Sequence, residues 1–358
     1  MECWPVSTAW SIPGLRVSDP AKLEAVKVYY SWLDRWDERR ARRGEEGKET
    51  TGFILDADRA FPSEKIKSVG EFCARADQAA TDLTFFDVPH GDDEGFETKD
   101  HWVTFQSDVP TDVAENNIVW AKVTGSASFD RALVIFHHWN ARARNPQIAS
   151  FFSKRGITVF EIAMPYHFER SRPGSAHADY MLSTNLGRTI ESVRQAVCDG
   201  RKLIRWLRSE GYQEISVLGM SLGSWVAGLI AAHDANVAKA SLFLAGGSLA
   251  DMVWTGRATR SIRESLEAEL ELTDLRRAWG PLNLENHVFR LARPDLDLQF
   301  ILAKRDKVVL PKLSEGLIRG LRGAGGQPQV LKMNCGHYSL GKLPYIIFAG
   351  LKAREFLS

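Results

Sequence analysis

The sequence Gly-Met-Ser-Leu-Gly at residues 219–223 has the pattern G-x-S-x-G, with an apolar segment before it and a helix-forming segment after it. Between a strand and a helix, this pattern forms a nucleophile elbow, a sharp turn that exposes a serine hydroxyl. Glycine is needed two residues to either side because a side chain there would collide with the neighbouring strand or helix. The pattern predicts that Ser221 is a nucleophile; the alternative is a glycine-rich turn whose serine only caps the helix.

A serine hydroxyl is a weak nucleophile without a general base, and the base needs a group that orients it. Two residues downstream fit these roles. Asp306 follows the apolar segment 298–303, and His337 follows the segment 329–333. The order serine, acid, histidine is the one expected after a nucleophile elbow. Asp251, which follows an earlier strand candidate, is an alternative acid.

The elements that would position these residues follow from hydrophobic patterning. Short apolar or β-branched segments predict eight strands, and the first two follow one another without a helix between them. From the third onward, strands alternate with helices, which predicts a mostly parallel sheet with helices on both faces and an antiparallel leading edge. The predicted strands are 101–107, 117–124, 131–138, 156–163, 214–219, 238–245, 297–303 and 329–334. The predicted helices between them are 184–209, 222–234, 311–322 and 342–356.

Two regions lie outside this alternation. Residues 1–100 are rich in charge and predict a mainly helical N-terminal extension, with helices at 19–43 and 64–80. Residues 247–290 interrupt the alternation with charged helical segments, which predicts a cap inserted into an α/β catalytic domain at 101–358.

The composition excludes several classes of protein. The chain has 358 residues, of which 44% are hydrophobic, and a formal net charge of +1, so it lacks the basic surface of a nucleic-acid-binding protein. The basic run at 39–43 is followed at once by acidic residues and indicates a solvated helix end. There is no apolar run of about 18 residues that would span a membrane.

Localisation and cofactors are also constrained. The N-terminus lacks the pattern of a secretory signal, and the cysteines are scattered, without a metal-binding spacing, at Cys3, Cys73, Cys198 and Cys335. These features favour a reducing compartment, and we expect a cytoplasmic protein. No nucleotide, flavin or metal motif is present, so no cofactor and no metal are expected.

The elbow, Asp306, His337 and the strand order across residues 101–358 resemble the α/β-hydrolase superfamily. The segments Pro-Tyr-His and Asn-Leu-Gly-Arg-Thr after the fourth predicted strand look like a bacterial branch of it, with a weaker likeness to its lipase- and esterase-like members. The resemblance implies a catalytic triad of Ser221, Asp306 and His337.

The resemblance also implies an oxyanion hole made of two backbone N–H groups. One belongs to Leu222, directly after the nucleophile, and the other to the loop after the third strand. In this superfamily that loop often begins with His-Gly, whereas here His138 stands where glycine is usual. The second donor is therefore Trp139 or His138, each bulkier than the usual residue.

Candidate substrate-binding residues lie around this edge of the sheet. Tyr166 and His167 follow the fourth predicted strand, and a loop leaving the carboxyl end of a strand opens where ligands bind in α/β folds. His138 and Met220 flank the predicted oxyanion hole and nucleophile. Trp254 lies in the cap, where it would help to form an apolar acyl pocket or pack in the core.

A serine nucleophile with a histidine base implies acyl transfer. The predicted function is hydrolysis of a carboxylic ester through an acyl-enzyme intermediate, with a small-molecule ester or acyl compound as substrate. An amidase, peptidase or thioesterase would use the same triad, and a non-catalytic binding protein could keep the same fold. The N-terminal extension would pack on the catalytic domain or form a homo-oligomer contact.

Overall fold

The computed structural model describes residues 20–45, 51–62, 64–88, 95–125 and 129–358. The first 19 residues of the predicted N-terminal extension, with Cys3, lie outside this part of the chain. Among the helices that the structure describes, none combines the length and the apolar character required to cross a bilayer.

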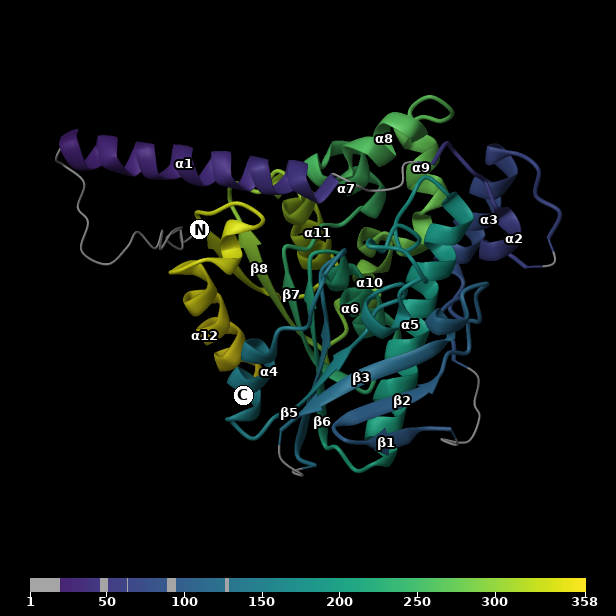
Figure 1. The fold of residues 1–358 in the computed structure, drawn as a ribbon, viewed down its shortest axis with the longest axis horizontal. Helices are drawn as coiled ribbons and strands as arrows, with labels where there is room; N and C mark the ends of the chain where they lie inside the picture. The colour runs from purple at the N-terminus through teal and green to yellow at the C-terminus, as the bar shows by residue number, and fades with distance from the viewer. Residues whose placement is uncertain (1–19, 46–50, 63, 89–94, 126–128) are drawn as a thin grey trace.

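The described residues form an α/β structure around one sheet (Figure 1). The strands are β1 (Glu97–Lys99), β2 (Trp102–Gln106), β3 (Ile118–Thr124), β4 (Arg131–Phe136), β5 (Thr158–Ile162), β6 (Glu214–Met220), β7 (Val237–Phe243), β8 (Asp297–Ala303) and β9 (Gln329–Met333). The helices are α1 (Pro20–Glu45), α2 (Ala57–Ala60), α3 (Val69–Thr81), α4 (Pro146–Ser153), α5 (Leu186–Ser209), α6 (Leu222–His233), α7 (Leu249–Thr255), α8 (Arg260–Leu266), α9 (Leu272–Ala278), α10 (Val288–Leu291), α11 (Pro311–Gly323) and α12 (Tyr345–Leu357).

The sheet has the strand order β1-β2-β3-β5-β4-β6-β7-β8-β9. The pairs β1–β2, β2–β3 and β3–β5 are antiparallel. From β5 through β4 and β6 to β9, all neighbours are parallel. The prediction of a mostly parallel sheet with an antiparallel leading edge is therefore confirmed.

The predicted number of eight strands was wrong, because the sheet described here has nine. All eight predicted strands are present, and the additional one is β1 at the antiparallel edge. Its three residues, Glu-Thr-Lys, are all exposed, so the sequence shows no alternation of apolar and polar residues there. The last predicted helix also begins three residues late, at Tyr345, because Pro344 occupies its N-cap.

The parallel strands are covered on both faces (Figure 1). Successive side chains of a strand point to opposite faces, and in β4 Val134 packs into one core cluster while Leu133 and Ile135 pack into the other. Helices α5, α6, α10 and α11 contribute to the first cluster, and α4 and α12 to the second. Burial on both faces explains the continuously apolar strand sequences.

Helices α7 to α10 occupy the predicted cap region between β7 and β8. Helix α3 contacts this region at α9: the Cys73 thiol donates to the Asp274 carbonyl, and Arg277 forms an ion pair with Asp77 at 2.7 Å. Figure 1 shows α1 lying along the same end of the molecule as α7 and α8. The described part of residues 1–100 is thus packed against the cap and the sheet domain.

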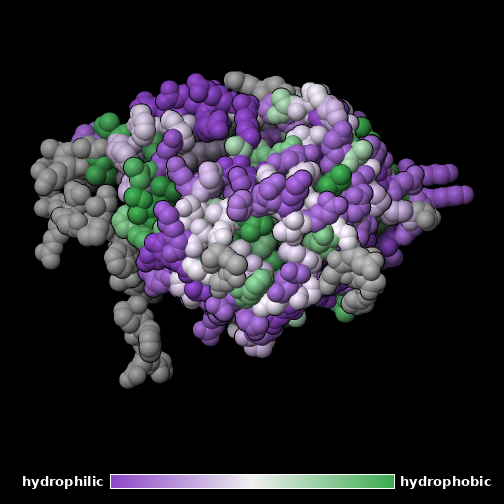
Figure 2. All heavy atoms as spheres, turned by 60° about the horizontal axis from the view of Figure 1, so that its bottom comes forward, coloured by the Kyte–Doolittle hydropathy of each residue, from purple (hydrophilic) through white to green (hydrophobic). Residues whose placement is uncertain are grey.

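The outer surface mixes polar and apolar side chains, as Figure 2 shows for one face. Large exposed apolar residues occur on α1, at Val28, Tyr29 and Trp32, and on α12, at Ile347 and Phe348. A homo-oligomer through the N-terminal extension stays a prediction.

Gly187 lies at the start of α5, where the helix packs against the backbone of Asp56, the residue before α2. A Cβ at Gly187 would lie 1.8 Å from the carbonyl oxygen of Asp56, so the backbone of one element would have to move. We expect Gly187→Ala to lower the free energy of unfolding by about 1–3 kcal/mol or more, measured by urea denaturation.

Gly316 provides the matched control. It lies inside α11, and a Cβ there would meet no atom within 4 Å. Gly316→Ala should raise the free energy of unfolding by about 0.5–1 kcal/mol, because alanine restricts the unfolded chain. Equal effects of the two substitutions would contradict the packing argument.

Candidate active site

Ser221 occupies the turn between β6 and α6, as the sequence predicts for an elbow. Its backbone angles are φ 52° and ψ −121°, in a region that non-glycine residues rarely adopt. A Cβ at Gly219 would lie 2.2 Å from the Gly223 carbonyl oxygen, and one at Gly223 would lie 2.3 Å from the Phe136 carbonyl oxygen. Both glycines are therefore required by close backbone approach, and the turn holds the serine in a strained conformation.

His337 connects Ser221 to Asp306. Its Nε2 lies 3.0 Å from the Ser221 hydroxyl oxygen, and its Nδ1 lies 2.8 Å from Asp306 Oδ2. The other carboxylate oxygen of Asp306 accepts the backbone N–H groups of Val308 and Val309, both at 2.8 Å. The acid is thus held by its own loop and directed at the imidazole.

These contacts define the direction of hydrogen bonding along the chain of three residues. An ionised carboxylate can only accept, so His337 Nδ1 donates to Asp306. Nε2 is then free of a proton and can accept one from the Ser221 hydroxyl. This arrangement can activate a serine oxygen for attack on an electrophilic carbon.

Asp251, the alternative acid in the sequence, lies elsewhere. Both of its carboxylate oxygens accept from the Arg276 guanidinium, at 2.7 and 2.8 Å. Hydrogen bonding to Arg276 is the main cause that lowers the pKa of Asp251. The carboxylate that the structure brings to His337 is that of Asp306.

The loop after β4 lies against the elbow, because a Cβ at Gly223 would also meet the His137 carbonyl oxygen at 2.4 Å. This loop therefore adjoins Leu222, the first residue of α6. The indole N–H of Trp139 donates to the Ala178 carbonyl at 3.0 Å. The structure brings together the elements of the predicted oxyanion hole, and the choice between the N–H groups of Trp139 and His138 stays a prediction.

His138 belongs to the same loop and interacts electrostatically with His337. Desolvation by the neighbouring atoms is the main cause that lowers its pKa to about 4, although the residue keeps an exposed surface, and the charges of His337 and then Arg40 act in the same direction. His138 is therefore close enough to His337 for their charges to interact. Arg40 belongs to α1, so the N-terminal helix reaches the surroundings of the site.

His167 holds the end of the same loop. Its Nε2 accepts from the backbone N–H of Asn140 at 2.9 Å, and its Nδ1 donates to the Pro165 carbonyl at 2.8 Å. Burial is the main cause that lowers the pKa of His167 to about 4, so the ring stays neutral and can accept. Both ring nitrogens are thus engaged in joining the loops after β4 and β5.

His137 makes a second link of the same kind. Its Nδ1 donates to the His138 carbonyl at 2.9 Å, and its Nε2 accepts from the Met164 N–H at 3.1 Å. Burial holds the pKa of His137 well below its usual value. The rings of His137 and His167 meet edge to face, with centroids 4.5 Å apart. Two neutral histidines therefore fix the loop that would supply the second oxyanion donor.

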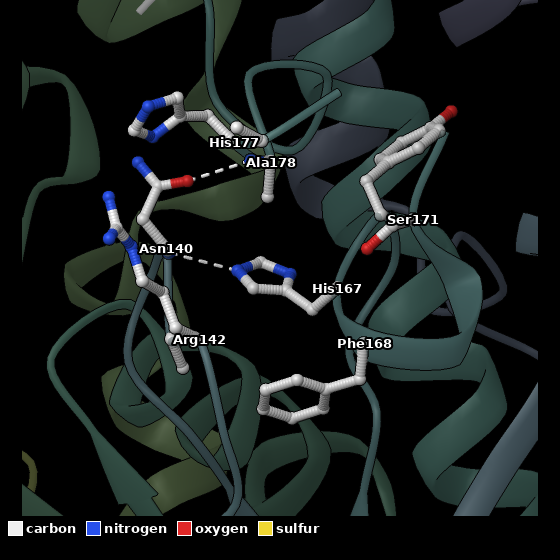
Figure 3. Close-up of a pocket in the computed structure, with 10 residues that line it drawn as sticks. Asn140, Arg142, His167, Phe168, Ser171, His177 and Ala178 are labelled. Atoms are coloured by element: carbon white, nitrogen blue, oxygen red, sulfur yellow. Dashed lines mark hydrogen bonds between the residues drawn. The ribbon is translucent and has the colours of Figure 1, made fainter. Parts of the chain in front are cut away.

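A cavity of about 250 Å³ lies beside this loop (Figure 3). Tyr166 and His167 are among its lining residues, together with Asn140, whose side-chain carbonyl accepts from the Ala178 N–H at 2.8 Å. Ser221 is not a lining residue of this cavity. A role for Tyr166 and His167 in substrate binding stays a prediction, and their described contacts are with the protein.

The other predicted pocket residues are partly buried. Met220 packs against the core cluster that contains α4 and α12, and Trp254 packs against the opposite cluster. The Tyr166 hydroxyl accepts from Arg188 at 3.5 Å, in the interior. A substrate contact for Met220 or Trp254 stays a prediction.

Two residues next to the loops that carry Asp306 and His337 were not singled out from the sequence. Asp34 on α1 binds the guanidinium of Arg305, the residue before Asp306. Asp37 accepts from the backbone N–H groups of Tyr338 and Ser339, the two residues after His337. These partners lie 271 to 302 residues further along the chain. No local sequence signal indicates such a contact.

Sequence comparison gives no relative for this chain. No protein family profile matches it, and no curated protein is detectably similar in sequence.

Solved structures, in contrast, share its fold. An acetyl xylan esterase from a Thermoanaerobacterium species has a TM-score of 0.57 at 14% identity, over 89% of this chain and 97% of the esterase. An acetyl xylan esterase from a Paenibacillus species has a TM-score of 0.55 at 13% identity, over 84% of this chain and 99% of that one.

A puromycin-hydrolyzing peptidase from Mycobacterium tuberculosis has a TM-score of 0.55 at 16% identity, over 67% of this chain. The match spans only 37% of the peptidase, so this chain corresponds to a part of it. Similarity at this level of identity concerns the fold. Together with the strand order and the strand–elbow–helix unit, it shows that this chain has the α/β-hydrolase fold.

Proposed function

We propose that this protein is a serine hydrolase that cleaves a carboxylic ester through an acyl-enzyme intermediate. The observation that carries the proposal is the continuous hydrogen-bonded chain from Ser221 through His337 to Asp306, at 3.0 and 2.8 Å. A nucleophile, a base and an orienting acid in this order are what acyl transfer requires. A binding protein would need none of these contacts.

In the first half of the reaction, Ser221 Oγ bonds to the carbonyl carbon of the substrate as its proton passes to His337 Nε2. The carbonyl electrons move to the oxygen, which becomes an oxyanion. The tetrahedral intermediate then collapses, the bond to the leaving oxygen breaks, and His337 protonates the leaving alcohol. Asp306 holds the imidazole in the required tautomer and stabilises the imidazolium.

Water completes the cycle. His337 takes a proton from water as the water oxygen attacks the acyl-enzyme, and a second oxyanion forms. When that intermediate collapses, the carboxylic acid leaves and Ser221 regains its proton. We assign the stabilisation of both oxyanions to the N–H groups of Leu222 and of Trp139 or His138.

An ester is the preferred substrate class in this proposal because two of the similar structures are acetyl xylan esterases that match this chain over most of their length. The peptidase supports the alternative of an amide substrate. On the protein side, Trp254 and Met220 are the residues we propose to contact the acyl group.

The nucleophile assignment predicts that Ser221→Ala folds but does not hydrolyse esters. Loss of a triad serine lowers kcat by about 10⁶-fold, because only binding and oxyanion stabilisation remain. Hydrolysis of p-nitrophenyl acetate and labelling by a fluorophosphonate probe would be measured for both proteins. Wild-type-like turnover or labelling of Ser221→Ala would rule out Ser221 as the nucleophile.

The acid assignment is tested by two matched substitutions. Asp306→Asn should lower kcat by about 10⁴-fold, because an amide can donate to Nδ1 and so favour the wrong imidazole tautomer. Asp251→Asn should leave kcat within about 3-fold, because its carboxylate pairs with Arg276, not with the imidazole. A larger loss of kcat in Asp251→Asn than in Asp306→Asn would identify Asp251 as the triad acid.

The substrate class is tested with a panel of p-nitrophenyl esters of increasing acyl length and a panel of aminoacyl anilides. We expect kcat/KM for the best ester to exceed that for the best anilide by at least about 100-fold, or about 2.7 kcal/mol. Ser221→Ala serves as the background control. A preference for anilides would identify an amidase or peptidase that uses the same residues.

A further inference from the structure

Helix α1 presents two carboxylates to the catalytic loops. Asp34 and Asp37 are three residues apart and therefore share one face of the helix. Both are within the half of α1 that packs on the body of the protein, where Leu33 and Ala41 are buried. Each carboxylate contacts a different loop, one carrying the triad acid and the other the triad histidine.

The first contact is with the loop that follows β8. Asp34 accepts from Nε and Nη2 of Arg305 in a two-point pair, with Nε–Oδ1 at 2.9 Å. The guanidinium of Arg305 also lies 5.1 Å from the Tyr30 ring, one helical turn earlier on α1. Arg305 immediately precedes Asp306, so the pair fixes the backbone from which the triad acid extends.

The second contact is with the loop that follows β9. Asp37 is only 7% exposed. Its Oδ1 accepts from Tyr338 N at 2.7 Å and Ser339 N at 3.1 Å, and its Oδ2 accepts from the Ser339 hydroxyl at 2.6 Å. One buried carboxylate therefore satisfies three donors in the two residues directly after His337.

The residue before the histidine is shaped by the same carboxylate. A Cβ at Gly336 would lie 2.5 Å from Asp37 Oδ2, so any larger residue there would have to displace the Asp37 carboxylate. The Gly336 N–H in turn donates to the Ser339 hydroxyl at 2.8 Å. The loop is thus closed around Asp37, with His337 in its middle.

The two loops are also joined to each other. The Arg305 N–H donates to the Cys335 carbonyl at 2.9 Å. Asp34, Arg305, Cys335 and Asp37 therefore form a connected frame around the hydrogen bond between Asp306 and His337. A displacement of α1 would therefore move the two loops and, with them, the His337 imidazole.

We propose that α1 is a positioning element of the active site and that Asp37 is the residue through which it orients His337. Asp34 supports Asp306 in the same way through Arg305. This inference rests on the proposed function, because it gives the residues of α1 a role in the same reaction. It assigns a part of the N-terminal extension to catalysis, although neither carboxylate takes part in proton transfer.

The test uses the full-length chain and the substitution Asp37→Asn. The amide keeps the size of the side chain but removes the charge and replaces one acceptor by a donor, which faces donors of the loop. A misplacement of about 1 Å at the reacting atoms can cost about 100-fold in rate. We expect kcat to fall by about 10- to 100-fold, with KM for p-nitrophenyl acetate within about 3-fold of wild type.

The rate is expressed per active site, counted by stoichiometric labelling of Ser221 with the fluorophosphonate, at a temperature below the unfolding transition. A purely stabilising role of Asp37 would lower the labelled fraction or the melting temperature but leave kcat per labelled serine unchanged. That result would overturn the proposal. A fall in kcat per labelled serine supports it.

Asp77→Asn is the matched control. Asp77 on α3 also joins the N-terminal region to the cap, through Arg277 at 2.7 Å, but it contacts neither catalytic loop. Its substitution should leave kcat per labelled serine within about 2-fold. An equal loss in both variants would overturn a specific role for Asp37.

Asp34→Asn decides the question if Asp37→Asn does not accumulate as folded protein. Its side chain is partly exposed, so its loss is less harmful to folding, and the same fall in kcat per labelled serine is expected through Arg305. An unchanged kcat in that variant would overturn the proposal.

The outcome is separate from that of Ser221→Ala. An active Ser221→Ala protein refutes the hydrolase mechanism, whereas an inactive Ser221→Ala protein together with unimpaired α1 variants refutes only the positioning role.

Discussion

The parallel register of β8 and β9 is the constraint on which the site depends. It pairs Ala303 with Met333, so the two strands end side by side. Asp306 follows three residues after the first position and His337 four residues after the second, which brings a carboxylate within 2.8 Å of an imidazole. In the same way Met220 pairs with Phe243 across β6 and β7, and the turn that holds Ser221 begins at this end of the sheet. A slip of one residue in the register would displace the loops that carry Asp306 and His337 relative to each other.

The juxtaposition of Ser221, Asp306 and His337 and the frame of the sheet could be predicted from the sequence because both depend on short-range patterns. The elbow needs glycines at fixed spacing, and a buried strand needs a run of apolar residues, whatever lies elsewhere in the chain. Strand β1 was missed because its exposed residues pair only through the backbone. The contacts of Asp34 and Asp37 were missed because their partners lie 271 to 302 residues further along the chain. From the sequence alone, an acidic residue on a charged helix is expected to be exposed to solvent.

His167 illustrates how many contacts a buried histidine next to a candidate site can make with the protein itself. A histidine after a strand end is typical of a ligand-binding residue, and in the structure His167 lies beside the loop that follows β4. Its role in substrate binding stays a prediction. Its two nitrogens, however, bond to Asn140 and Pro165, so burial keeps the ring neutral and turns it into a spacer between two loops. Periodicity and motif spacing carry no information about which hydrogen-bond partners a buried ring will find.

The attachment of α1 has a consequence for the order of events during biosynthesis. A chain leaves the ribosome from its N-terminus, so α1 emerges long before the loops around Asp306 and His337, its partners at the far end of the sequence. Contacts of such separation form late, after the sheet has been assembled. A growing chain that has not reached residue 337 would therefore carry Ser221 without the base proposed for it. On the proposed mechanism, Ser221 would become an activated nucleophile only after the loop that carries His337 has been made and has docked on Asp37 of α1.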